Sequence, residues 1–154
     1  MNWSAIKECD IANGPGVRVS LFVSGCTRHC PGCFNPGTWP FDAGQLFTEE
    51  TVERIIGFLK RDYIAGLSLL GGEPFEPSNE AALVPFLKRV RQEVPGKTVW
   101  CWSGFTLDEL KGREMLGLLD VLVDGPFIRE KRDISLSWRG SSNQRVNYLK
   151  IVGN

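Results

Sequence analysis

Three cysteines lie within one short stretch of the sequence, as Cys26, Cys30 and Cys33. Thiolates are soft ligands that suit iron, and Pro31 and Gly32 favour a bent loop in which the three side chains converge. Such a loop can hold three irons of a cubane iron–sulfur cluster, which leaves the fourth iron without a protein ligand. An open metal position is typical of a centre that binds a substrate or cofactor, whereas a closed four-ligand site is usually structural.

Two other interpretations of this loop stay open at the level of spacing. A zinc site needs a fourth ligand, which His29, Cys9 or Cys101 would supply, and C-x-x-C motifs recur in zinc proteins. A disulfide is disfavoured because the chain has five cysteines, an odd number, and nothing in it indicates secretion. The spacing favours iron–sulfur over zinc.

The composition is that of an ordinary globular protein of one domain, spanning residues 1–154. Hydrophobic residues make up 42% of the chain and charged residues 23%, which is enough apolar material for a real core. Eighteen basic residues balance eighteen acidic ones, so no overall field attracts nucleic acid or an anionic membrane. The first 13 residues hold no apolar run suited to a signal peptide. We therefore expect a cytoplasmic protein whose thiols stay reduced.

Strand and helix patterns alternate along the chain. The 13–16 turn (Asn-Gly-Pro-Gly) precedes an alternating, β-branched strand. Thr48 is suited to cap a helix, and Thr106 and Glu109 resemble a capping box, whereas Pro85 predicts a late start or a kink in the helix around it. The predicted strands are 17–23, 65–70, 98–102, 121–123 and 146–152, and the predicted helices are 48–61, 78–93 and 106–116.

The unusual residues follow directly after predicted strands. They are the cysteine loop, the 71–73 turn (Gly-Gly-Glu), Ser103-Gly104 and Asp124-Gly125. The strand–turn–helix order predicts right-handed parallel βα units, whose strand carboxyl ends share one edge. A complete eight-unit barrel needs about 200 residues or more. We therefore expect an α/β fold, either an incomplete parallel (β/α) barrel or a curved open sheet with the site at the strand carboxyl ends, open on one side to a large partner.

The Gly71-Gly72-Glu73-Pro74 turn is informative in combination with the cysteine loop. Alone, it is a common strand-to-helix turn. Adjacent glycines allow positive φ and a close approach of a ligand to the backbone, and Glu73 can accept a hydrogen bond from an ammonium group. Together, the C-x-x-x-C-x-x-C loop and this turn resemble the radical S-adenosylmethionine superfamily.

This resemblance implies a set of cofactor-binding residues. Cys26, Cys30 and Cys33 would ligate a 4Fe-4S cluster, whose free iron would bind the amino and carboxylate groups of S-adenosylmethionine. No catalytic residue is implied beyond the cluster and the cofactor. The residues implied for S-adenosylmethionine are Gly71, Gly72 and Glu73 at the methionine end, Gly32, Cys33 and Phe34 beside the adenine, and Ser103 and Asp124 at the rim.

A narrower resemblance rests on three stretches. The Cys-Pro-Gly-Cys-Phe-Asn variant at 30–35, the 13–16 turn and the 138–144 stretch resemble the activating proteins of anaerobic ribonucleoside-triphosphate reductases over nearly the whole chain. This implies reductive cleavage of S-adenosylmethionine to methionine and a 5′-deoxyadenosyl radical, which takes a hydrogen atom from a glycine of the reductase. The implied partners are the reductase and a one-electron donor such as flavodoxin.

Other functions also fit the sequence. The same radical chemistry could act on another glycyl-radical enzyme or on a small molecule, and the chain could also be a non-catalytic zinc or iron–sulfur module. We expect His29 to be a loop residue, because a fourth ligand would block S-adenosylmethionine. We expect Cys9 and Cys101 to be small buried or half-buried residues. The 139–145 segment is either a polar loop before the last strand or a grip on the cofactor or the reductase.

Overall fold

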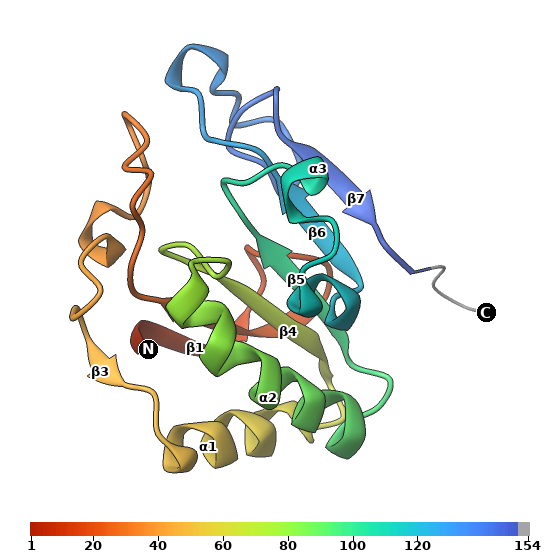
Figure 1. Ribbon diagram of the computed structural model, residues 1–154. Coiled ribbons are helices and arrows are strands. Elements are labelled where there is room, and N and C mark those ends of the chain that lie inside the picture. Colours follow the sequence, from red (N-terminus) through yellow and green to blue (C-terminus); the bar gives the residue numbers. More distant parts are fainter. Residues whose placement is uncertain (151–154) are drawn as a thin grey trace.

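A seven-stranded sheet runs through the computed structural model, which describes residues 1–150 (Figure 1). The strands lie in the order β3-β1-β2-β4-β5-β6-β7, so the described sheet is open, with β3 and β7 at its edges. The central strands β2, β4, β5 and β6 are parallel to one another, whereas β1, β3 and β7 are antiparallel to their neighbours. The strands are β1 (Asn2–Asp10), β2 (Val17–Val23), β3 (Gln45–Leu46), β4 (Ile64–Gly71), β5 (Thr98–Trp102), β6 (Val121–Asp124) and β7 (Arg145–Tyr148).

Helices α1 and α3 begin where the sequence predicts caps. Thr48 accepts a hydrogen bond from Thr51 N ahead of α1 (Glu49–Leu59), and Thr106 and Glu109 form the predicted capping box of α3 (Leu107–Leu110). The longest helix is α2 (Pro77–Glu93). Short 3-10 helices span Pro36–Thr38, Glu114–Leu118 and Arg129–Lys131.

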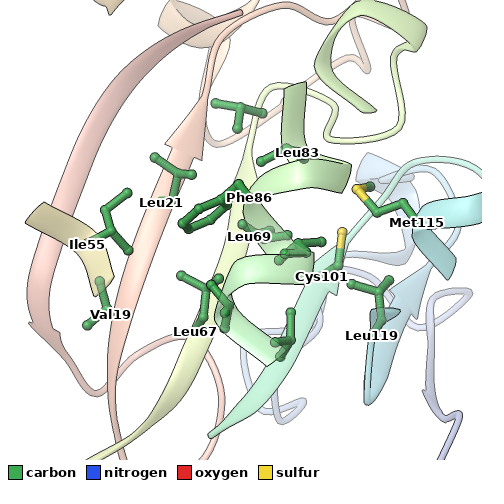
Figure 2. Close-up of a cluster of buried hydrophobic side chains, with 14 of the residues drawn as sticks. Val19, Leu21, Ile55, Leu67, Leu69, Leu83, Phe86, Cys101, Met115 and Leu119 are labelled. Carbon is green, nitrogen blue, oxygen red and sulfur yellow. The ribbon is translucent and has the colours of Figure 1, made fainter. Parts of the chain in front are cut away.

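The hydrophobic core lies on the helix-covered side of the sheet. Leu21 of β2 and Leu69 of β4 are fully buried there against Ile55 of α1 and Phe86 of α2 (Figure 2). Because side chains alternate along a strand, every second residue of β2, β4 and β5 joins this core. Burying this apolar surface holds the parallel strands together and so fixes the edge at which their carboxyl ends meet.

A buried polar network occupies the opposite side of the sheet. Arg18 is fully buried and donates to Ser68 Oγ at 2.8 Å and to Thr98 O at 2.9 Å. Ser68 Oγ in turn donates to Asn13 O at 2.6 Å, so the 13–16 turn covers this side. Gly14 has φ +103°, and a Cβ on this residue would lie 2.8 Å from Arg18 Cδ. Both the backbone conformation and the lack of space therefore favour glycine at this position.

The structure confirms most predicted elements and corrects others. Strands β1 and β3 were not predicted. Helix α2 passes through Pro85, so the predicted late start is wrong. Proline has no N–H to donate to the carbonyl of Ala81, but Ala81 is exposed, so water can bond that carbonyl instead. The predicted 106–116 helix ends at Leu110, because Lys111 leaves the helical conformation with ψ 132° and Gly112 then adopts φ +86°. Strand β7 spans Arg145–Tyr148, whereas the prediction was 146–152; residues 151–152 of that prediction lie outside the described part.

Within the described part of the chain, no helix combines the length and apolar character needed to cross a membrane.

Candidate active site

A cavity of about 580 Å³ lies at the carboxyl ends of the parallel strands. The ends of β2, β4 and β5 supply its walls from three segments that are far apart in the sequence, as predicted. Of the predicted site residues it brings together Cys26, Cys30, Cys33, Phe34, Gly71, Gly72, Glu73 and Ser103, whereas Gly32 and Asp124 are not among its lining residues.

The cysteine loop is held to the body of the protein by main-chain hydrogen bonds. Cys26 N donates to Trp39 O at 3.0 Å, and Glu73 N donates to Gly25 O at 2.8 Å. A Cβ on Gly72 would lie 2.6 Å from Gly25 O, so the second glycine of the turn permits this close approach. The loop and the Gly71–Glu73 turn therefore form one unit.

The side chain of Thr27 is fixed by an acidic residue of the neighbouring helix. Glu76, the N-cap residue of α2, is 8% exposed, and its Oε1 accepts from Thr27 N at 3.0 Å and from Thr27 Oγ1 at 2.7 Å. Both bonds act on the residue that follows Cys26. Glu76 thereby sets the direction of the loop beyond the first cysteine.

The three loop thiols are free and half-buried in the cavity wall. Burial raises the pKa of Cys26, and hydrogen bonds from the backbone of His29 and Arg28 oppose that rise. In residues 1–150 no three His, Cys, Asp or Glu side chains gather around one ion position. The ligands of a cubane cluster bind different irons and need not meet at one point. Three free thiols in one cavity wall, next to a glycine turn, fit a 4Fe-4S cluster.

Glu73 is a buried carboxylate beside these thiols. It is 3% exposed, and it accepts from Ser103 Oγ at 2.7 Å, Gly104 N at 2.7 Å and Phe75 N at 3.0 Å. Burial raises its pKa, while those three hydrogen bonds and the charge of Arg28 act in the opposite direction. Ser103 thus helps to hold the carboxylate of Glu73 in place at the cavity.

Sequence reasoning missed Arg28, which lines the cavity between two of the cysteines. Its guanidinium carbon lies 4.8 Å from the ring centre of Phe105. A Cβ on Gly104 would lie 2.6 Å from Arg28 Nε, so the glycine after Ser103 makes room for the guanidinium. Arg28 forms no ion pair with another described residue, and its charge faces Glu73. The sequence signal that could have identified Arg28 as a site residue is its position between two of the ligand cysteines.

The 139–145 segment belongs to the cavity wall. Arg139, Gly140 and Gln144 line the cavity. Gln144 Oε1 accepts from Gly140 N at 2.9 Å, and its Nε2 donates to Gly125 O at 3.0 Å. Arg139 Nε is buried without a hydrogen-bond partner among the described residues. The segment therefore ties the end of β6 to the cavity, and it places a guanidinium there.

The remaining predicted residues lie elsewhere. His29 stacks on Trp39 with ring centres 4.3 Å apart, and it is not a lining residue. Cys101 is fully buried in the core, as expected, but Cys9 is exposed on β1, which corrects the prediction of a buried or half-buried residue. Asp124 is 1% exposed, and its carboxylate accepts from Leu107 N at 2.7 Å.

Comparison with known proteins gives a consistent result. A family model described as a 4Fe-4S single cluster domain matches residues 12–147. The anaerobic ribonucleoside-triphosphate reductase-activating protein of Escherichia coli strain K12 is 46% identical over 154 residues, covering 97% of this chain and 100% of the relative. The protein of the same name from Haemophilus influenzae is 47% identical over 155 residues, covering 98% and 100%. That of Enterobacteria phage T4 is 42% identical over 146 residues, covering 95% and 93%.

Proposed function

Because the chain belongs to the family of anaerobic ribonucleoside-triphosphate reductase-activating proteins, we propose that it generates a glycyl radical on such a reductase. It is an enzyme that uses a 4Fe-4S cluster and S-adenosylmethionine. Together these groups supply one-electron cleavage of a carbon–sulfur bond and, from it, removal of a hydrogen atom from a glycine of the reductase. The protein contributes binding, orientation and exclusion of competing hydrogen donors.

Each group of residues at or beside the cavity has a proposed part. Cys26, Cys30 and Cys33 hold the cluster, and Glu73 with the backbone of Gly71 and Gly72 binds the methionine ammonium. A carboxylate on the same carbon atom as that ammonium would lie beside Arg28, whose charge already faces Glu73. The backbone around Gly32, Cys33 and Phe34 borders the adenine, and Ser103 and Asp124 support the rim through hydrogen bonds.

One observation carries this assignment. The loop thiols and the buried carboxylate of Glu73 face one cavity although they come from different βα units, and the bond from Glu73 N to Gly25 O holds them together. A purely structural metal site needs neither an open cavity nor a buried acid beside it. Convergence of these groups therefore supports a centre that binds a cofactor next to the cluster.

We also propose that residues 1–154 form one domain whose sheet is an incomplete (β/α) barrel. The open seven-stranded sheet and the four parallel strands that end at the cavity support this assignment. We place the protein in the cytoplasm, where reducing conditions keep thiols available to iron. The five cysteines, all free in the structure, are compatible with that location.

Anaerobic incubation with dithionite, S-adenosylmethionine and the reductase tests the function directly. Electron paramagnetic resonance should then show a glycyl radical on the reductase, with one methionine formed per radical. A chain that binds zinc and cleaves no S-adenosylmethionine would contradict the proposal. Cleavage that proceeds with a small molecule and leaves the reductase without a radical would contradict it as well.

A further inference from the structure

A basic segment lies against the outer side of the cysteine loop. The 3-10 helix Arg129–Lys131 and the residue after it are exposed. Arg129 packs on Gly32, since a Cβ there would lie 3.0 Å from Arg129 Cδ, and the guanidinium carbon of Arg132 lies 5.3 Å from the ring centre of Phe34. Cationic side chains from more than 90 residues along the chain thus cover the loop that carries the thiols. We call Pro31, Gly32, Arg129, Lys131 and Arg132 the basic face.

Positive charge is concentrated around this face. The 26–40 and 126–145 segments carry six basic side chains, three of which (Arg129, Lys131 and Arg132) belong to the basic face, and two acidic ones, Glu130 and Asp133. The rest of the balanced chain carries twelve basic and sixteen acidic side chains. Among residues 1–150, Arg129, Lys131 and Arg132 form no ion pair. Their charges are therefore available to a partner, and Figure 1 shows both segments at the end of the molecule opposite α1.

The two sides of the cysteine loop differ in what they can receive. The cavity side faces Glu73 and Arg28 and, under the proposed function, receives S-adenosylmethionine and a glycine of the reductase. Pro31 and Gly32, on the outer side, are exposed to solvent, and their side of the loop is not part of the active-site cavity lining. A partner on the outer side comes close to the loop thiols without entering the cavity. The proposed reaction needs a partner that donates electrons, because each cleavage consumes one electron.

We propose that the basic face is the docking surface for an acidic one-electron donor protein. This inference rests on the proposed function. Opposite charges steer such a partner to the face and speed association, an effect that salt weakens. In the transfer, the donor protein loses one electron and the cluster gains one, with no bond made or broken in the activating protein.

Charge reversal tests the docking surface, with an acidic flavodoxin, fully reduced by its own reductase, as the donor. The test variant is Lys131→Glu combined with Arg132→Glu. The matched control is Arg54→Glu combined with Lys60→Glu, which makes the same charge change at exposed positions in and next to α1. Iron content and the absorption spectrum verify that each variant carries its cluster.

With flavodoxin at limiting concentration, we expect stopped-flow absorption to show that flavodoxin reduces the cluster of the test variant about tenfold more slowly than the cluster of wild type. Titration calorimetry should show matching loss of flavodoxin binding, while the control variant stays within twofold of wild type. With dithionite instead, all variants should cleave S-adenosylmethionine and activate the reductase at equal rates.

Two results overturn the inference while leaving the proposed function intact. One is an equal loss of flavodoxin binding in the test and control variants, or no loss in either. The other is a test variant that no longer activates the reductase with dithionite, which would assign the basic face to the reductase. Failure of wild type to activate the reductase with either electron source would instead reject the proposed function.

Discussion

The loop cysteines differ from the other two in what surrounds their sulfur atoms. Cys26, Cys30 and Cys33 line the cavity, whereas Cys101 is enclosed in the core and Cys9 lies on exposed β1. We predict that replacing any one loop cysteine by Ala abolishes S-adenosylmethionine cleavage, because each holds a separate iron. Cys9→Ala and Cys101→Ala should keep both cluster and cleavage. A Cys101 variant that lost its cluster, while a loop variant kept one, would reassign the ligands.

The buried carboxylate of Glu73 is the proposed site for the methionine ammonium. We predict that Glu73→Ala weakens S-adenosylmethionine binding without removing the cluster. A lost hydrogen bond to a charged group is worth about 1.5 to 3 kcal/mol, or roughly a tenfold to hundredfold change in affinity. Titration of the reduced cluster, followed by electron paramagnetic resonance, measures this change. Asp133→Ala, another acid of the cavity wall, is the control and should bind normally; equal weakening in both variants would reject the role of Glu73.

The prediction for Glu76 differs, because Glu76 is hydrogen-bonded to the cysteine loop and does not line the cavity. Its Oε1 accepts both hydrogen bonds from Thr27, and a glutamine oxygen can accept the same two. We predict that Glu76→Gln keeps a full complement of iron, whereas Glu76→Ala loads less iron and shows an altered spectrum of the reduced cluster. Iron and sulfide analysis with electron paramagnetic resonance measures both. Equal spectra for the alanine variant and wild type would show that Thr27 needs no anchor.

At the scale of elements, the turn before β2 closes the side of the sheet that no helix covers. Asp10 is 5% exposed and accepts from Ser20 Oγ at 2.6 Å and Asn13 Nδ2 at 2.7 Å. We predict that Asp10→Ala lowers the free energy of unfolding by about 1.5 to 3 kcal/mol, because it leaves these donors unpaired. Anaerobic thermal unfolding measures the loss. Asp108→Ala, which removes an exposed pair with Lys111, is the control and should change stability by less than about 0.5 kcal/mol.

The same elements show what the sequence could predict. Strands β2, β4 and β5 were predicted because their alternation and β-branched residues are local signals. Strand β1 was missed because Lys7, Glu8 and Cys9 are all exposed, so the strand lacks a regular alternation of buried and exposed residues. It is held by pairing with the next strand, β2, and with β3, which is distant in sequence. No pattern in the sequence indicates that Arg18 is fully buried.

At the site, motif residues were predictable and their neighbours were not. The cysteine loop and the 71–73 turn each follow a strand, and strand ends meet at one edge. Asp124 is the last residue of β6, and its carboxylate accepts a hydrogen bond from Leu107 N of α3, a contact that no sequence pattern indicates. Arg28 was missed because its position depends on the space left by Gly104, which only the folded chain shows.

At the scale of the whole molecule, the open sheet bears on how the reductase reaches its cofactor. Edge strands β3 and β7 leave the described sheet unclosed, and the cavity lies at the ends of the strands between them. Under the proposed function, the 5′ carbon of bound S-adenosylmethionine should therefore be reachable from the side where further barrel units would stand, and a glycine-bearing loop of the reductase should enter there.

This arrangement predicts that the reductase is the source of the abstracted hydrogen atom. Without the reductase, cleavage should be slow, because no donor fills the open side of the cavity. With reductase labelled by deuterated glycine, mass spectrometry should find one deuterium in 5′-deoxyadenosine for each glycyl radical formed. Reductase with its radical glycine replaced by alanine is the control and should transfer no label. Unlabelled product from the labelled reductase, together with full turnover on a small molecule alone, would identify a small-molecule enzyme instead.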